Sequence, residues 1–132
     1  MKALLDTHIL LWWVNGDSRL SSRQRQILEQ AGEDQPLWVS DISLWEIATL
    51  TSLKRIEMLI PLRDWLERAT APPLVQRMPI SPAVAAEVAA LPDDFHRDPA
   101  DRIIVASARV LGATLLTQDH RIIKAELVPT LA

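Results

Sequence analysis

Four acidic residues stand at the ends of different segments of the chain, where their carboxylates can act together. They are Asp6, Glu46, Asp101 and Asp119. Asp6 and Asp119 each follow a short apolar run that is typical of a buried strand. Converging carboxylates repel one another unless a cation lies between them, and hard divalent ions such as Mg²⁺ take oxygen ligands. The pattern therefore predicts a carboxylate metal site and phosphoryl-transfer chemistry.

Each acid also has a purely structural interpretation. Asp6 and Asp119 precede expected helices and can cap them, and Ser43–Glu46 has the S-x-x-E form of a capping box. Asp98 before a proline is a favoured N-cap, and Asp101 would lie in the first turn that follows. Caps can equally be Ser, Thr or Asn, however. Acids gathered at one sheet edge need a further reason, and a bound cation provides it.

The elements that position these acids follow from the apolar pattern and the turn signals. Expected strands cover 4–6, 37–40, 75–80, 114–117 and 127–128, and expected helices cover 7–14, 21–32, 43–53, 61–71, 81–90, 98–110 and 119–124. Short apolar strands that alternate with helices favour an α/β fold with a parallel sheet covered on both faces. In such a sheet, ligand sites form beyond the carboxyl ends of the strands.

Length and composition indicate a single domain over residues 1–132. The chain is 48% hydrophobic and 23% charged, which is ordinary for a globular protein, and it has no cysteine, which excludes disulfides and thiolate metal sites. No apolar run approaches the roughly 18 residues of a membrane span, and the short apolar start meets an acid at once. We therefore expect a cytoplasmic protein without a membrane partner.

Charge and motif content exclude several function classes. The net charge of −3 argues against broad electrostatic attraction to nucleic acid, although a local basic rim is compatible with it. The chain has three glycines and neither a P-loop nor a G-x-G-x-x-G motif, so nucleotide cofactors are not expected. No G-x-S-x-G motif supports a serine hydrolase. The three histidines form no metal pair and are interpreted as residues at the rim of the acidic site.

Four segments, in order, then resemble one known family. They are Leu4-Leu5-Asp6-Thr7-His8, the stretch 39–48 from Val39 to Ala48, the stretch 97–108 with its D-P-A-D-R motif, and Leu115-Leu116-Thr117-Gln118-Asp119. Together they resemble the PIN domains, and specifically the VapC-like toxin ribonucleases of bacterial toxin–antitoxin pairs. The resemblance covers essentially the whole chain.

The resemblance implies a three-layer α/β/α fold with a five-stranded parallel sheet of order 3-2-1-4-5. It also implies that four acids bind Mg²⁺ or Mn²⁺ and carry the catalysis, namely Asp6, Glu46, Asp101 and Asp119. Asp98 is an additional candidate ligand or supporting residue. Three hydroxyl side chains are expected to orient the carboxylates by hydrogen bonds: Thr7, Ser40 and Thr117.

The implied activity is metal-assisted hydrolysis of RNA phosphodiester bonds. Four basic residues flank the acids as candidate phosphate contacts, namely Arg97, Arg102, Arg121 and Lys124. The implied partners are a second copy of the chain in a homodimer and a cognate VapB-like antitoxin. The expected groove for the antitoxin lies between helices 7–14 and 43–53, with Trp12, Trp13 and Trp45.

Several alternatives remain beside this interpretation. The chain can be a PIN nuclease of RNA processing rather than a toxin, or a PIN-fold module that binds without catalysis. A receiver-like phosphorylation domain would need an acid pair after the first strand and an acid after the third, which Asp6 and Met78–Ile80 do not supply. A haloacid-dehalogenase-type phosphatase would need D-x-D where Asp6–His8 stands.

Overall fold

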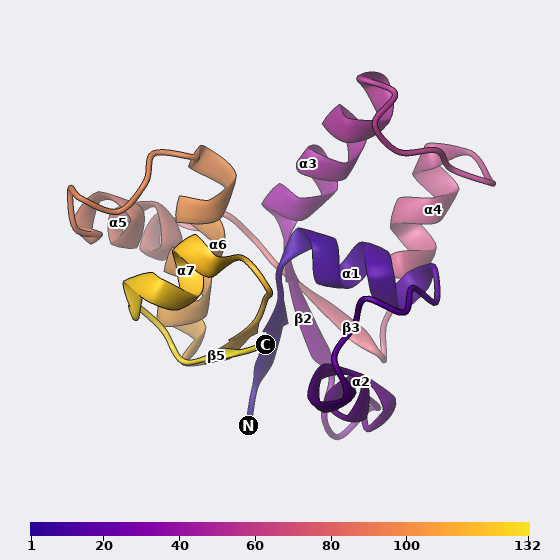
Figure 1. Ribbon diagram of the computed structural model, residues 1–132, viewed down its shortest axis with the longest axis horizontal. Helices are drawn as coiled ribbons and strands as arrows, with labels where there is room; N and C mark the ends of the chain where they lie inside the picture. The colour runs from indigo at the N-terminus through magenta and orange to yellow at the C-terminus, as the bar shows by residue number, and fades with distance from the viewer.

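The computed structural model describes residues 1–132 and is built on one five-stranded parallel sheet. The strands are β1 (Ala3–Leu5), β2 (Leu37–Ser40), β3 (Val75–Met78), β4 (Thr114–Leu116) and β5 (Thr130–Leu131). Their order is β3-β2-β1-β4-β5, which confirms the predicted topology. Because β1 pairs with both β2 and β4, the winding reverses at β1 (Figure 1). Open α/β sheets bind ligands beside such a switch point.

Seven helices connect and cover the strands. They are α1 (Thr7–Val14), α2 (Ser22–Glu29), α3 (Asp41–Ser52), α4 (Leu62–Ala69), α5 (Pro82–Ala90), α6 (Pro99–Leu111) and α7 (His120–Ala125). Figure 1 shows α5, α6 and α7 on one face of the sheet and α1, α2 and α4 on the other, so the chain forms three layers. None of these helices combines the length and the apolar character that a membrane span requires.

The core is divided by the sheet into two clusters of 13 buried residues each. Successive side chains of a strand point to opposite faces, so Leu4 and Leu115 join the cluster under α6, while Leu5 and Leu116 join the cluster under α1. All four are fully buried. Burying one such side chain stabilises the fold by about 1.5–3 kcal/mol, and both faces of the two central strands are therefore tightly held.

Polar residues at the strand ends begin the next helices. Asp6 caps α1 directly after β1, and Asp119 caps α7 shortly after β4. Ser40 at the end of β2 accepts a hydrogen bond from the Ile42 amide and caps α3. The capping-box interpretation of Ser43–Glu46 was therefore wrong, because α3 begins at Asp41 and Ser43 lies inside the helix.

The fifth strand lies at Thr130–Leu131 rather than at the predicted 127–128. Glu126 adopts a left-handed conformation (φ 53°) at the end of α7, and Val128 then packs into the core as an irregular segment. Pairing with β4 begins at Pro129, whose carbonyl accepts from the Leu115 amide at 2.9 Å. The apolar pattern correctly identified Val128 as buried, but it did not identify the residues that pair with β4.

Candidate active site

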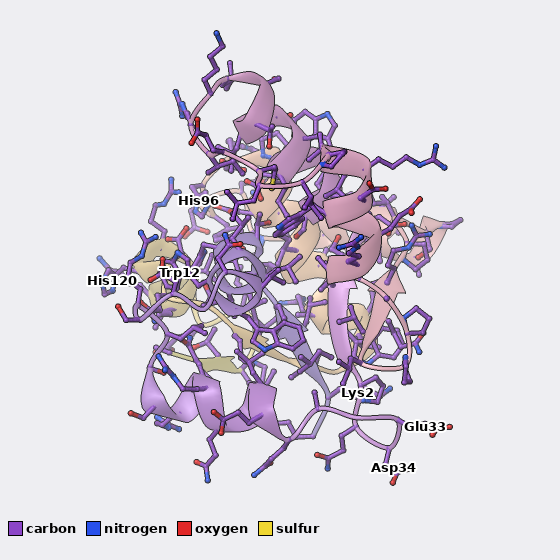
Figure 2. The ribbon with its side chains drawn as sticks, turned by 90° about the vertical axis from the view of Figure 1, so that its right-hand side faces the viewer. Lys2, Trp12, Glu33, Asp34, His96 and His120 are labelled. Carbon is purple, nitrogen blue, oxygen red and sulfur yellow. The ribbon has the colours of Figure 1, made fainter.

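All of the predicted acids line one cleft at the carboxyl end of the sheet. The cleft has a volume of about 220 Å³, and its walls are Asp6, Thr7, His8, Leu11, Glu46, Leu50, Asp98, Asp101, Asp119 and Arg121. Figure 2 shows the two ends of the molecule: Lys2, Glu33 and Asp34 lie at the amino end of the strands, and His96 lies toward the opposite end. Side chains from distant parts of the chain therefore meet at one place.

The topology explains how the acids converge. Leu5 of β1 is in register with Leu116 of β4, so Asp6 and the Thr117–Asp119 segment leave adjacent strands at the same edge. Glu46 projects from α3 and Asp101 from the first turn of α6. These two helices contact each other over the strand ends. The switch point thus receives two acids from strand ends and two from helices.

Thr117 links Asp6 to Asp119 at the centre of the cleft. Its hydroxyl donates to Asp6 Oδ2 at 2.7 Å and accepts from the Asp119 amide at 3.0 Å. Asp6 Oδ1 also accepts from the Thr7 amide at 2.8 Å. Asp6 and Thr117 are both buried, so these bonds fix the Asp6 carboxylate in one orientation.

A second hydroxyl pair holds Glu46. The Thr7 hydroxyl donates to Glu46 Oε1, and Ser43 Oγ lies 2.8 Å from the same hydroxyl. The pKa of Glu46 is raised, chiefly by burial and further by the carboxylates of Asp6 and Asp101, against the lowering effect of the bond from Thr7. Thr7 thus contacts a site acid in the way the sequence predicted.

Ser40 lies outside this network. Its hydroxyl accepts from the Ile42 amide at 3.2 Å as the cap of α3, and it bonds to no carboxylate. Ser43, one helical turn before Glu46 and not among the predicted residues, bonds to the Thr7 hydroxyl and so supports the residue that holds Glu46.

Asp101 is held by cationic or ionisable groups instead of hydroxyls. His96 Nε2 lies 2.7 Å from Asp101 Oδ2, and Arg121 Nη2 lies 3.5 Å from that oxygen. The pKa of Asp101 is raised to about 6, chiefly by burial and then by neighbouring acids such as Asp6 and Asp119, while the bond with His96 lowers it. Asp98 supports this side by accepting from the Asp101 amide at 3.2 Å.

Arg121 also bridges the two C-terminal acids. The same Nη2 atom lies 3.5 Å from Asp119 Oδ2 and from Asp101 Oδ2. The pKa of Arg121 is raised, first by its bond to Asp119 and less by the charge of Asp101. A positive group therefore already lies among these carboxylates.

The donor set suits a hard divalent cation. Five carboxylates and the hydroxyl of Thr7 line the cleft, and such oxygens are the ligands that Mg²⁺ and Mn²⁺ prefer. In the arrangement seen, no group of three acidic or histidine side chains is assembled tightly enough to hold an ion. Thr7, His96 and Arg121 engage the carboxylates in this arrangement.

Two histidines contribute more than the rim position expected for them. His8 Nε2 accepts from the Gln118 amide at 3.0 Å, and His8 Nδ1 lies 3.6 Å from Asp6 Oδ2. His96 contacts Asp101, as described. His120 is exposed on α7. Sequence spacing could not pair His96 with Asp101, because the contact depends on how the loop before α6 folds back over its first turn.

The structure also separates the four basic candidates. Arg102 is buried, and its Nη1 atom donates to the carbonyls of Phe95 at 2.9 Å and His96 at 3.3 Å. It therefore anchors the loop before α6 and cannot reach a phosphate. Arg97, Arg121 and Lys124 are exposed. Of the three, Arg121 and Lys124 lie together on α7.

Comparisons with known proteins identify the family of the chain. Residues 3–127 match the PIN domain family. Ribonuclease VapC22 of Mycobacterium tuberculosis is 41% identical over 119 residues, which cover 90% of this chain and 88% of that protein.

Solved structures have the same fold. The structure of VapBC2 from Rickettsia felis bound to a promoter DNA fragment includes a chain that matches with a TM-score of 0.74 and 15% identity, over 99% of this chain and 98% of that one. A toxin–antitoxin complex from Klebsiella pneumoniae matches with a TM-score of 0.66 and 18% identity, over 99% and 97%. At such identities the likeness concerns the fold. Together with the family match over most of the sequence, it shows that this chain belongs to the PIN domain family.

Proposed function

We propose that the chain is a Mg²⁺- or Mn²⁺-dependent endoribonuclease and the toxin of a VapBC-type pair. The observation that carries this proposal is the gathering of five carboxylates in one cleft of a PIN domain. The 41% identical relative is named a ribonuclease, which supports RNA as the substrate. We further propose that it acts in the cytoplasm.

In this proposal the position of each acid determines its role. Asp6, Glu46, Asp101 and Asp119 hold the cation, Asp98 supports Asp101, and a bound divalent cation supplies Lewis acidity and a nucleophile at neutral pH. Thr7 and Thr117 keep Glu46 and Asp6 oriented. Asp101 or Asp119 accepts the proton of the attacking water.

The test is cleavage of a cellular RNA pool by the purified chain with Mg²⁺ or Mn²⁺, with EDTA, and with the variant Asp6→Asn. Asparagine keeps the shape and the cap of α1 but removes the charge. We expect discrete fragments that need the metal and a fall in rate on the order of 10²–10³-fold in the variant. Asp34→Asn, an exposed acid before β2, is the matched control and should cleave normally.

Equal fragment patterns from folded wild type and Asp6→Asn would contradict catalysis at this site. Retained binding of RNA without any cleavage would instead favour the non-catalytic binding module. Specific cleavage of a ribosomal RNA precursor, with no growth arrest on expression, would favour a processing nuclease over a toxin.

The proposed partners are a second copy of the chain and a VapB-like antitoxin. Apolar side chains stand exposed along α3 and the segment after it, with Trp45 60% and Leu59 100% exposed. A groove of about 560 Å³ between Trp13 and Trp65 lies on the same half of the molecule. Exposed apolar surface of this kind marks protein interfaces. Trp45→Glu should weaken co-purification with the antitoxin while the metal-dependent cleavage by the free chain persists.

A further inference from the structure

A second pocket lies beside the acidic cleft, between α7 and the loop that precedes α6. Its volume is about 510 Å³, within the range of about 300–1,000 Å³ in which proteins bind small ligands. Arg121 and His96 line the second pocket, and both also contact Asp101 in the cleft. A chain of nucleotides whose scissile phosphate lies at the acids therefore has a direct path into it.

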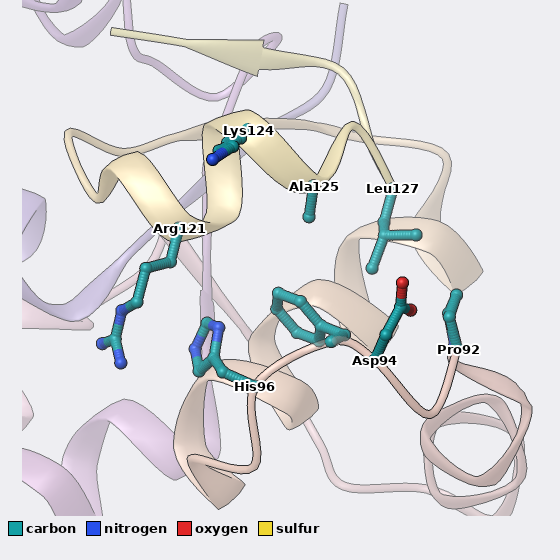
Figure 3. Close-up of a pocket in the computed structure, with 8 residues that line it drawn as sticks. Pro92, Asp94, His96, Arg121, Lys124, Ala125 and Leu127 are labelled. Atoms are coloured by element: carbon teal, nitrogen blue, oxygen red, sulfur yellow. The ribbon is translucent and has the colours of Figure 1, made fainter.

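The two ends of the pocket differ in charge. Figure 3 shows Arg121 and His96 together at one end and Asp94, Pro92 and Leu127 at the other. Lys124 stands three residues after Arg121 on α7, so both cations lie on the same helix face. A phosphate is attracted to the first end and repelled from the second, which fixes the direction of an entering nucleotide.

Two aromatic rings form the floor of the pocket. Phe95 is buried, and its ring lies 4.3 Å from the His96 ring. Arg102 holds this loop from beneath through the Phe95 carbonyl at 2.9 Å and stands 5.8 Å from the Phe95 ring. Ala125 faces the pocket from α7 and leaves room above the floor (Figure 3). Such a floor suits the flat surface of a base and its ribose.

We propose that this pocket is the subsite for the nucleotide next to the scissile phosphate. Arg121 and Lys124 contact the phosphate that follows the cut, and the base lies over the floor formed by Phe95 and His96. The inference rests on the proposed ribonuclease activity and specifies where its substrate is held. Lys124 is then a substrate-positioning residue, since it touches none of the acids.

The experiment compares Lys124→Ala with Arg63→Ala, which removes the same charge from an exposed position on α4. The probes are a labelled single-stranded RNA, bound with Ca²⁺ in place of the catalytic ion, and the metal-dependent cleavage reaction. We expect Lys124→Ala to weaken binding by about 5- to 10-fold, to reduce the salt dependence by about one counterion, and to raise KM with little change in kcat. Arg63→Ala should change neither quantity.

A second pair of variants tests the pocket without changing any charge. Ala125→Met fills the space above the floor and should raise KM by several-fold, whereas Ala89→Met on the exposed side of α5 should not. Thermal unfolding confirms that each variant is folded.

The outcomes separate the two proposals. If wild type cleaves RNA but Lys124→Ala behaves as Arg63→Ala and Ala125→Met behaves as Ala89→Met, the subsite is wrong and the ribonuclease stands. A wild-type chain that neither binds nor cleaves RNA overturns both.

Discussion

The two halves of the acidic cleft hold their carboxylates by different means. On the side of α1 and α3, Asp6 and Glu46 accept from the hydroxyls of Thr117 and Thr7, which are buried. On the side of α6 and α7, Asp101 and its neighbour Asp119 face His96 and Arg121, and Arg121 is largely exposed. Hydroxyls fix a carboxylate without neutralising it, whereas cations neutralise it and can leave. The difference indicates a rigid half, which contains Asp6 and Glu46, and an exchangeable half, which contains Asp101 and Asp119.

The largest expected effect tests the rigid half. Thr117→Val keeps the shape but removes the hydroxyl that serves both Asp6 and the Asp119 amide. We expect cleavage to slow by about 10- to 100-fold, as for other groups that orient metal ligands, and stability to fall by about 1–3 kcal/mol because a buried amide and carboxylate lose a partner. Single-turnover cleavage and urea unfolding measure the two effects.

Thr114→Val is the matched control for that variant. It makes the same change three residues earlier, at the start of β4, where the threonine side chain makes no hydrogen bond in the structure. Equal losses in both variants would show that the β-strand, not the hydroxyl, is sensitive, and the rigid half would lose its basis.

The next effect concerns the charge of the exchangeable half. The pKa of Asp101 is about 6 in the folded chain and 3.8 for an ordinary Asp, so the folded state binds more protons between these values. Stability is therefore lost as pH rises from about 4 through 6. Asp101→Asn should be more stable than wild type at pH 8, by at most about 3 kcal/mol, and should show no such gain at pH 4.

Unfolding at several pH values checks this, with Asp34→Asn as an exposed acid of ordinary surroundings. Adding Mg²⁺ should stabilise wild type more than Asp101→Asn, because the variant lacks one of the carboxylates proposed to bind the ion. If the difference in stability between Asp101→Asn and wild type is the same at pH 4 and at pH 8, then ionised Asp101 does not destabilise the fold.

The smallest expected effect concerns Arg121, the exposed cation of the exchangeable half. Arg121→Gln removes the guanidinium that lies 3.5 Å from both Asp101 and Asp119. Exposed ion pairs contribute little because water screens them, so Mn²⁺ should bind only about two- to five-fold more tightly. Calorimetric titration measures this, and Arg19→Gln, whose partner Asp17 lies outside the cleft, should bind as wild type does. Weaker Mn²⁺ binding by Arg121→Gln would mean that the arginine supports the site instead of competing for it.

The two acids that follow strands were the more predictable ones. Leu5 and Leu116 are fully buried strand residues, and the polar residue after each such strand leads into the site, so position in the sequence is enough to find Asp6 and Asp119. The confirmed sheet order then places both at one switch point.

The features that were not predicted from the sequence depend on three-dimensional contacts that residue spacing does not indicate. Ser43 faces Thr7 only because α3 begins at Asp41, two residues earlier than expected. His96 meets Asp101 because Arg102 draws the preceding loop inward. The fifth strand was misplaced because Val128 is buried without pairing.

Three of the site acids also serve as helix caps: Asp6, Asp98 and Asp119 each accept from an amide at the start of the next helix. Substitutions of these acids that inactivate the protein would therefore fall into two kinds. Asp to Asn, a single base change, retains the cap and leaves an intact chain that would still bind and titrate the proposed antitoxin. Asp to Ala or Val removes the cap as well, so the product is prone to degradation. If the chain is the proposed toxin, genetic screens for survivors would recover the first kind as stable, inert protein and the second as a near-absence of protein.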